Sequence, residues 1–318
     1  MFDPLRSGSD MRIFAGTAHP ELARAICDAL GMSLGASHVV RFSNDNMMVQ
    51  IDENVRAKDV FLIQSSCPPV ADHLLELLIT IDALTHASAA RIKAVISYFP
   101  YVRSDKDRPR ISIAARLVAD LLHTAGASRV LTMDLHSPQI QGFFRMPVDP
   151  LIAAPIICDH IRATRQLDDY VLLAGDIREA KGAGRYAERL KLPVAIIDKR
   201  RDDDSERPKA AHMIGDVREK KVLIVDDEIG TAGTVLEAAR FALEKEASSV
   251  EAAAVHGVLC GPAVERLAAS AVSSVIVTDT IPIPQSKRQK LEVLTVAGLF
   301  ARAIAAVHRG ESVSDLFR

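Results

Sequence analysis

Cysteine is scarce in this sequence, and its spacing excludes the sites that cysteine usually builds. Cys27, Cys67, Cys158 and Cys260 are scattered over 318 residues without a CxxC pair. We therefore expect neither a zinc site nor a disulfide framework. Three of the four lie in apolar runs or beside Pro or Gly, which favours buried, inert thiols in a reducing cytoplasm.

An excess of charge of one sign and a long hydrophobic run are also absent. The formal net charge is −2, which excludes a non-specific nucleic-acid binder because such proteins need a basic surface. No apolar stretch is long enough to cross a bilayer. The first residues lack the basic, apolar and small-residue succession of a signal peptide. We expect a cytoplasmic protein with neither nucleic acid nor membrane as partner.

The length and the order of patterns predict a two-domain α/β protein. A chain of 318 residues with 48% hydrophobic residues can bury two cores. Strand and helix patterns alternate throughout, which indicates a mostly parallel sheet in each half. The change near Pro147–Pro150 places the domains at 1–149 and 150–318. Strands are expected at 11–16, 39–42, 48–51, 60–64, 92–97, 129–136, 170–174, 194–197, 222–225, 250–255 and 275–277. Helices are expected at 20–30, 113–122 and 297–308. Others are expected after Pro69 (with apolar positions from 74 to 84), up to 161, through 190, from 235 and from 262.

The stretch from Lys221 to Thr234 carries the strongest functional pattern. A buried strand, Val222–Val225, is followed by Asp226 and Asp227 and then by a small-residue turn, Gly230-Thr-Ala-Gly-Thr234. Such a turn entering a helix offers backbone N–H groups and hydroxyls to a phosphate. The acidic pair suits Mg²⁺ or the hydroxyls of a sugar. The alternative is a turn whose glycines serve only its geometry.

Other charged residues also follow predicted strands. His136 is either structural or a ligand at the sheet edge, and Asp176 is a loop or helix-capping residue or a metal ligand. Asp198-Lys199-Arg200-Arg201 is either a solvated charge run or a mobile loop that stabilises a transferring phosphoryl group. A second basic loop surrounds Arg103, Asp105 and Lys106.

Three predicted strands end alike, at Asp134, Asp226 and Asp279. Duplicated domains would explain this similarity. Parallel sheets in general also produce such endings, and this second explanation is slightly preferred.

Ten blocks of the sequence match the pattern of one known family: Phe42-Ser43, Val49–Arg56, Phe61–Ser65, Asp134-Leu-His136, Gln139–Phe144, Pro147-Val-Asp149, Ala195–Arg201, Ile214–Val217, Val225-Asp-Asp227 and Asp279–Pro282. Through these blocks the chain resembles the ribose-phosphate pyrophosphokinase (phosphoribosyl pyrophosphate synthetase) family from Met11 onward. The resemblance implies two similar phosphoribosyltransferase-like domains. It also implies Mg²⁺-dependent transfer of the diphosphoryl group of ATP to the 1-hydroxyl of ribose 5-phosphate, by a homo-oligomer built from dimers and often hexameric.

The resemblance also implies roles for individual residues. Lys199 and Arg201 would be catalytic, and His136 and Asp176 would be associated with the metal. Residues 226, 227 and 230–234 would bind ribose 5-phosphate: Asp226, Asp227, Gly230, Thr231, Ala232, Gly233 and Thr234. ATP would be bound partly across a subunit interface by Phe42, Asn44, Asp45, Asn46, Arg103, Ser104 and Asp105.

Several positions depart from the family pattern. Asn44 and Asn46 replace two acids, Gly230 replaces an aspartate, and Arg178-Glu179 replaces a Gly-Gly pair. The loop after Arg103 is also shorter, which leaves regulation by ADP and phosphate open. These losses motivate a catalytically weak or inactive regulatory homologue that associates with an active synthetase. A phosphoribosyltransferase that consumes the product is a further alternative, which the basic loops at 103–110 and 199–201 disfavour.

Overall fold

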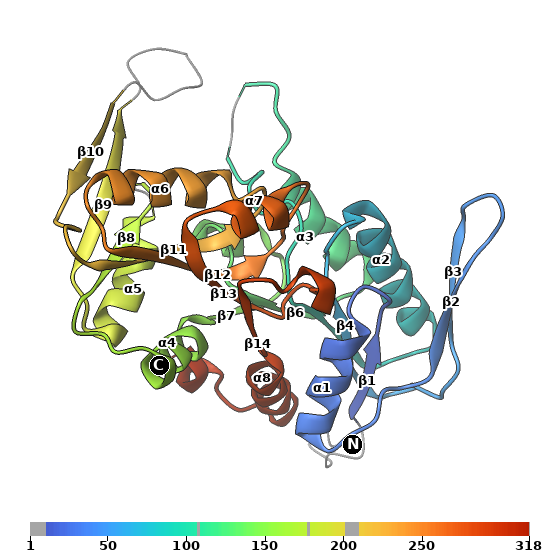
Figure 1. Cartoon of the computed structure of the whole chain (residues 1–318). Helices are drawn as coiled ribbons and strands as arrows, with labels where there is room; N and C mark the ends of the chain where they lie inside the picture. The colour runs from blue at the N-terminus through green and yellow to red at the C-terminus, as the bar shows by residue number, and fades with distance from the viewer. Residues whose placement is uncertain (1–10, 107–108, 177–178, 201–209, 318) are drawn as a thin grey trace. The chain divides into compact units, whose positions relative to one another are not determined.

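The computed structural model describes residues 11–106, 109–176, 179–200 and 210–317. These residues form two compact units. The first contains the described residues up to Ile152, together with Thr280–Pro282 and the residues from Thr295 onward, and the second contains the remainder. Figure 1 shows a sheet flanked by helices in each unit, which confirms the predicted α/β class.

Five parallel strands form the sheet of the first unit, in the order β1-β4-β5-β6-β7. They are β1 (Met11–Ala15), β4 (Asp59–Gln64), β5 (Arg91–Ile96), β6 (Arg129–Met133) and β7 (Val148–Leu151). Between them lie α1 (Pro20–Leu30), α2 (Val70–His86), α3 (Ala114–Ala125) and the 3₁₀ helix η2 (Pro138–Phe143). A separate antiparallel hairpin consists of β2 (Ser37–Arg41) and β3 (Met47–Ile51), and Figure 1 shows it extending from the side of this unit.

The sheet of the second unit has seven strands, in the order β10-β9-β8-β11-β12-β13-β14. All neighbours are parallel except β9 and β10. The strands are β8 (Tyr170–Ala174), β9 (Val194–Arg200), β10 (Ala210–Ile214), β11 (Lys221–Ile229), β12 (Ser249–Gly257), β13 (Val272–Thr278) and β14 (Leu291–Leu294). The helices are α4 (Ala154–Thr164), α5 (Ala180–Leu190), α6 (Gly233–Glu244), α7 (Ala263–Ala269) and η3 (Gln285–Lys287).

The two units repeat one succession of elements. In each, a strand and a helix lead to an antiparallel pair, and four further strands complete a five-stranded parallel array. β1, β4, β5, β6 and β7 correspond in this way to β8, β11, β12, β13 and β14, and the hairpin β2–β3 corresponds to β9–β10. The corresponding strands β6 and β13 are both followed by an aspartate. This fits duplicated domains, the explanation that was not preferred from the sequence alone.

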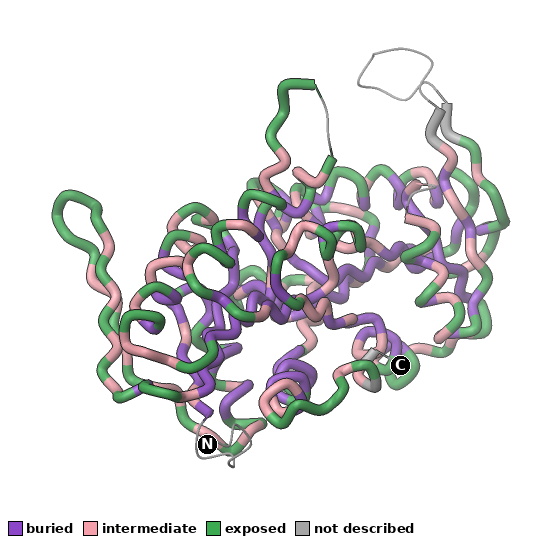
Figure 2. Tube along the Cα trace, turned by 180° about the vertical axis from the view of Figure 1, so that it is seen from behind, coloured by how far each residue is buried: buried purple, intermediate pink, exposed green. Residues whose placement is uncertain are grey.

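Local sequence explains why these elements form where they do. Helix α1 begins with Pro20 at its first turn, the ring nitrogen of His19 accepts a hydrogen bond from Leu22 N (3.3 Å), and Gly31 ends the helix at φ 65°. Strands β4 and β8 are buried along their whole length, and Figure 2 shows that the buried residues lie in the interior of the Cα trace. The apolar runs Val60–Ile63 and Val171–Ala174 suit such burial. The polar ends of β4, Asp59 and Gln64, are buried with bonded partners.

The chain returns to the first unit after the second sheet is complete. Helix α8 (Ala297–Arg309) packs against α1, and His308 Nδ1 lies 2.7 Å from Asp59 Oδ2 at the start of β4. The predicted division at 149 and 150 thus differs from the structure. The first unit extends through β7, which pairs with β6, and it includes the final helix.

A second returning segment covers the carboxyl edge of the first sheet. The hydroxyls of Ser65 and Ser97, which follow β4 and β5, both donate to the carbonyl of Thr280, at 3.0 and 2.7 Å. Thr280 itself is fully buried. Part of the edge at which α/β sheets usually bind ligands is therefore filled by the protein's own backbone.

Three strands were not predicted: β7, β10 and β14. All three stand at or next to the margin of a sheet and are short. β7 contains Asp149-Pro150, a pair more typical of turns. Among the helices of the described residues, none combines the length and apolar character needed to span a membrane.

Candidate active site

The connections of the second sheet change direction between its central strands. From β8 the chain passes through α5 to β9 on one side, whereas from β11 it passes through α6 to β12 on the other. Such a switch point opens a crevice at the carboxyl ends of the two strands. Asp176 follows β8 after Gly175, and Asp226 and Asp227 belong to β11, so the fold brings these predicted site residues to one edge.

Strand β11 continues past the end that the apolar run predicts. The expected end at Val225 is wrong, because β12 stays paired with β11 as far as the partners Ile229 and Gly257. Pairing with β8 stops earlier, at Val225 and Ala174. Asp226 and Asp227 therefore lie on a strand that is still paired with β12. They are next to the turn that follows β8, where a ligand can reach them.

The surroundings of the acidic pair disfavour its charged form. The carboxylate of Asp226 accepts a hydrogen bond from Asp227 N (2.8 Å), and that of Asp227 accepts one from Glu228 N (2.9 Å). Burial raises the pKa of Asp226 well above its ordinary value, and the neighbouring carboxylates of Asp227 and Glu179 raise that pKa further. Hydroxyl donors or a cation would relieve this repulsion.

The turn after β8 is closed by two reciprocal hydrogen bonds. Glu179 N donates to Asp176 Oδ1 (3.0 Å), and Gly175 N donates to Glu179 Oε2 (3.0 Å). This arrangement resembles a capping box shifted by one residue. It lies ahead of α5, whose N-cap is Glu179 without a side-chain capping bond, so Asp176 closes the turn and does not cap the helix, and its partly exposed carboxylate remains at the sheet edge.

The turn at residues 230–234 leads directly into α6, as predicted. Thr231, Gly233 and Thr234 are exposed, and a Cβ placed on Gly230 would meet no atom within 4 Å. Ala232 is buried at φ 63°, a conformation that favours glycine. The open turn can receive a phosphate on its N–H groups and hydroxyls.

The basic residues after β9 lie partly on the strand. The sequence places the strand end at Ile197, but β9 reaches Arg200 because β10 pairs with it up to Arg200 and Ala210. Lys199 is therefore a strand residue, and Arg201 lies outside the described residues.

The predicted ATP-binding residues of the first unit fall on two separate segments. Phe42, Asn44, Asp45 and Asn46 form the exposed tip of the hairpin β2–β3, where Phe42 N donates to Asn46 O (2.8 Å). Arg41 joins this hairpin to α2 through Asp72 (2.8 Å).

Arg103, Ser104 and Asp105 lie within the connection between β5 and α3. The Ser104 hydroxyl donates to Ser112 O (2.9 Å) and accepts from Ala114 N (3.3 Å), so it closes the base of this loop. Figure 1 shows the loop and the hairpin tip well apart, with α2 between them. One copy of the chain does not bring the two segments together.

The two predicted metal residues belong to different units. His136 is exposed on the segment between β6 and η2, whereas Asp176 is in the second unit. Within the described ranges, no group of three or more His, Cys, Asp or Glu side chains is arranged to hold a metal ion. Mg²⁺ is often held by only one or two carboxylates together with ligand phosphates, which fits a metal that arrives with a nucleotide.

Two residues near the crevice were not identified as site residues from the sequence. Glu179 reaches the neighbourhood of Asp226, and Arg266 of α7 donates to Thr231 O (3.4 Å) at the turn. The replacement of Gly-Gly was a signal for Glu179. For Arg266 no signal was present, because only tertiary packing brings α7 to the turn.

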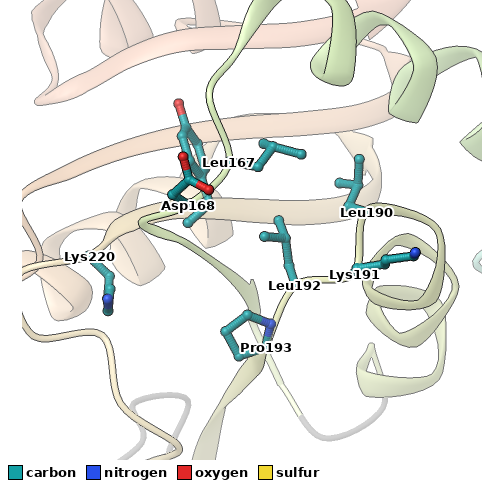
Figure 3. A pocket seen from close by; sticks show the side chains of 8 residues that line it. Leu167, Asp168, Leu190, Lys191, Leu192, Pro193 and Lys220 are labelled. Carbon is teal, nitrogen blue, oxygen red and sulfur yellow. The ribbon is translucent and has the colours of Figure 1, made fainter.

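A hollow lies at the opposite, amino edge of the second sheet. It is lined by residues that precede β8, β9 and β11, including Leu167, Leu192 and Lys220. Figure 3 shows Lys191 and Lys220 on opposite sides of its leucines. Because parallel strands present opposite ends at the two edges, this hollow is separate from the crevice that holds Asp176 and Asp226.

Fold and site together define an α/β protein whose parallel sheet presents acidic side chains and a phosphate-type turn at its switch point. The family model for the N-terminal domain of ribose phosphate pyrophosphokinase matches residues 11–126, and that for the phosphoribosyl synthetase-associated domain matches residues 205–318. The chain belongs to the ribose-phosphate pyrophosphokinase family.

Individual relatives agree over nearly the whole length. The chain is 48% identical to the ribose-phosphate pyrophosphokinase of Caldanaerobacter subterraneus, covering 98% of this chain and 99% of the relative. It is 49% identical to that of Deinococcus radiodurans, covering 97% and 98%. The crystal structure of phosphoribosylpyrophosphate synthetase from Mycobacterium smegmatis superposes with a TM-score of 0.90 at 41% identity, covering 95% of this chain and all of that one.

Proposed function

We propose that the protein transfers the diphosphoryl group of ATP to the 1-hydroxyl of ribose 5-phosphate. The hydroxyl oxygen attacks the β-phosphorus, the bond between the α-phosphate and the β-phosphorus breaks, the hydroxyl proton is lost, and AMP leaves. The observation that carries this proposal is the family membership over the full length, with the acidic pair and the turn both kept at the switch point. None of the comparisons favours an inactive homologue.

The second unit supplies the sugar half of the reaction in this proposal. The N–H groups and hydroxyls of residues 230–234 bind the 5-phosphate, and Asp226 and Asp227 accept hydrogen bonds from the ribose hydroxyls. These hydroxyls relieve the repulsion between the carboxylates. Lys199 and Arg201 stabilise the charge that develops on the diphosphoryl group, since phosphoryl transfer depends on positioning and electrostatics.

Mg²⁺ fits the residues at this edge as an ion held together with the nucleotide. Asp176 offers carboxylate oxygen, the ligand type that Mg²⁺ prefers, and the resemblance adds His136. When bound, the ion neutralises phosphate charge. The residues of the chain then hold the sugar so that its 1-hydroxyl faces the diphosphoryl group.

ATP binding requires more than one copy of the chain in this proposal. The hairpin tip with Phe42 and the loop with Arg103 are separated within one unit, whereas the resemblance assigns both to ATP. A homo-oligomer that places one copy's hairpin beside another copy's loop resolves this. Exposed apolar side chains on α3, Leu117 and Leu121, support such an assembly.

We also place the protein in the cytoplasm. All four cysteines are free thiols, and Cys27, Cys67 and Cys158 are buried. Free, buried thiols fit a reducing compartment.

The proposal is tested by incubating the purified protein with ATP, Mg²⁺ and ribose 5-phosphate and measuring AMP, with and without inorganic phosphate. AMP formation that depends on ribose 5-phosphate is expected. Absence of AMP under all phosphate conditions, with co-purification of an active synthetase, would instead establish the regulatory role. Pyrophosphate release that depends on a nucleobase would indicate a phosphoribosyltransferase.

A further inference from the structure

Glu179 places a negative charge where a phosphate-binding site needs a positive one. Its Oε2 accepts the hydrogen bond of Gly175 N (3.0 Å), at the carboxyl end of β8. Backbone N–H groups at this edge are the donors that phosphates use. In the ligand-free chain a side-chain carboxylate therefore occupies a donor suited to an anion.

The position of Gly175 shows that this donor faces the ligand crevice. A Cβ placed on Gly175 would lie 2.8 Å from Glu179 Oε2 and 3.7 Å from the Thr234 methyl carbon. Thr234 belongs to the proposed phosphate turn. The carboxylate of Glu179 thus lies over the same opening as the turn, and it is also close enough to Asp226 to repel that carboxylate.

The first unit also holds donors after a strand with a carboxylate, but at a different position, because Gly16 N, which corresponds to Gly175 N, donates to Ile63 O (2.9 Å). After β1, the strand that corresponds to β8, Thr17 N and the Thr17 hydroxyl both donate to the carboxylate of Glu76, at 2.6 and 2.5 Å. Glu76 is 2% exposed and comes from the interior side of α2. Glu179, in contrast, is partly exposed and lies on a turn of its own. Glu179 is therefore accessible to a ligand, whereas Glu76 is buried.

We propose that Glu179 is an internal competitor for phosphoryl groups: it occupies Gly175 N–H in the empty site and must be displaced when a phosphorylated ligand binds. This inference rests on the proposed function, since it concerns the same crevice. Glu179 accordingly weakens the affinity for anionic ligands, and its return to Gly175 favours their release.

A purely structural role predicts something different. If the Glu179 side chain only closes the turn before α5, its loss lowers the melting temperature slightly and leaves anion affinity unchanged. If it acts only through its long-range charge, its loss raises anion affinity at low salt and not at high salt, because salt screens such fields.

The experiment measures binding rather than turnover. Inorganic pyrophosphate and ribose 5-phosphate are each titrated calorimetrically into wild type, Glu179→Ala and Glu179→Gln at constant Mg²⁺, at about 50 and 500 mM salt. Glu188→Ala is the control, because Glu188 is an exposed carboxylate on α5 itself. We expect about tenfold tighter binding of at least one of the two anions to Glu179→Ala, the size of one displaced charge-assisted hydrogen bond. We expect a smaller gain for Glu179→Gln, which keeps an acceptor, and no gain for the control.

A gain that persists at high salt supports the proposal. Unchanged or weaker binding of both anions by a folded Glu179→Ala, or a gain lost at high salt, overturns it, and Glu179→Gln decides in the same way if the alanine variant unfolds. The AMP assay on wild type is independent of these titrations. AMP formation without a gain in affinity refutes only the role of Glu179, and a gain without AMP formation refutes only the proposed reaction.

Discussion

Burial of Asp226 favours its neutral form, whereas the proposed binding of a sugar uses its charged form. Folding places its carboxyl group on a buried strand beside Asp227 and near Glu179, and these surroundings raise its pKa. In the proposed function the same carboxylate accepts hydrogen bonds from a sugar. The protein therefore keeps a destabilising group that a ligand would make favourable, as is common in active sites.

Replacing Asp226 by Asn is expected to stabilise the free protein at neutral pH. The folded state raises this pKa, so the wild-type carboxyl costs nothing below its unfolded pKa of about 4 and costs progressively more as the pH rises toward the folded value. Asn does not titrate. We expect a gain of about 1–3 kcal/mol at pH 7 that disappears near pH 4, measured by thermal unfolding without ligand.

The exposed Asp168→Asn serves as the control and should show no such pH dependence. A variant Asp226→Asn that is less stable than wild type at pH 7 would contradict the prediction. The same variant should bind ribose 5-phosphate more weakly, by about tenfold, because the sugar hydroxyls lose a charged acceptor.

Lys199 tests the catalytic part of the proposal. Its charge should matter most when the diphosphoryl group is in flight, so Lys199→Ala is expected to lower kcat by about 100-fold or more and to change the KM values little. Steady-state AMP formation measures both parameters. Lys245→Ala, at the end of α6, is the matched control. An unchanged kcat would remove Lys199 from the mechanism.

At the scale of elements, the first sheet is tied to its final helix by a buried charge cluster. Asp59 of β4 contacts Lys93 of β5, Arg91 (2.9 Å) and His308 of α8 (2.7 Å). Burial and the charge of Arg129 lower the pKa of Lys93 to about 7, while contact with Asp59 favours its ammonium form. The cluster joins two strands to α8, and so holds the C-terminal segment in the first unit.

Lys93→Met should destabilise the protein strongly, by about 2–4 kcal/mol in urea unfolding, because Asp59 would lose a buried partner. Arg91→Met is the matched control, since it removes a cation from the same carboxylate at an exposed position. The Arg91 side chain is 47% exposed and that of Lys93 is 4% exposed. We expect the control to cost less than about 1 kcal/mol. Equal costs for the two variants would show that burial does not set the strength of this cluster.

At the scale of the whole molecule, assembly should be inseparable from ATP binding. Leu117 and Leu121 are 52% and 38% exposed one turn apart on α3, and Ile111, before this helix, is 56% exposed. Apolar side chains so close together are typical of a surface that another subunit covers. A protein that divides its ATP site between copies needs such a surface.

Leu117→Lys is accordingly expected to reduce the molecular mass measured by light scattering and to raise the KM for ATP, while the affinity for ribose 5-phosphate stays within about twofold. Ile214→Lys, a change at a similarly exposed apolar residue of the second unit, should leave the mass unchanged. Wild type that is monomeric at all concentrations, or Leu117→Lys that keeps the wild-type mass, would refute this prediction.

Local patterns in the sequence were sufficient for most elements and for the position of the acidic pair. Helix α1 has the predicted bounds because Pro20 begins an amphipathic run and Gly31 ends it. Strand β8 coincides with its five-residue apolar run. The pair Asp226-Asp227 and the turn at 230–234 were identified because residues adjacent in the sequence form them. Such features depend on the nearest neighbours along the chain, which a sequence displays directly.

Only the tertiary structure determined which distant residues meet. The continuation of β11 past Asp226 depends on β12, and the membership of α8 in the first unit depends on contacts such as that of His308 with Asp59. The approach of Glu179 to Asp226 and of Arg266 to Thr231 likewise joins separate elements. Each of these contacts forms because packing and strand pairing stabilise contacts between segments that are remote in the sequence. The periodicity of one segment does not specify which other segment it will contact.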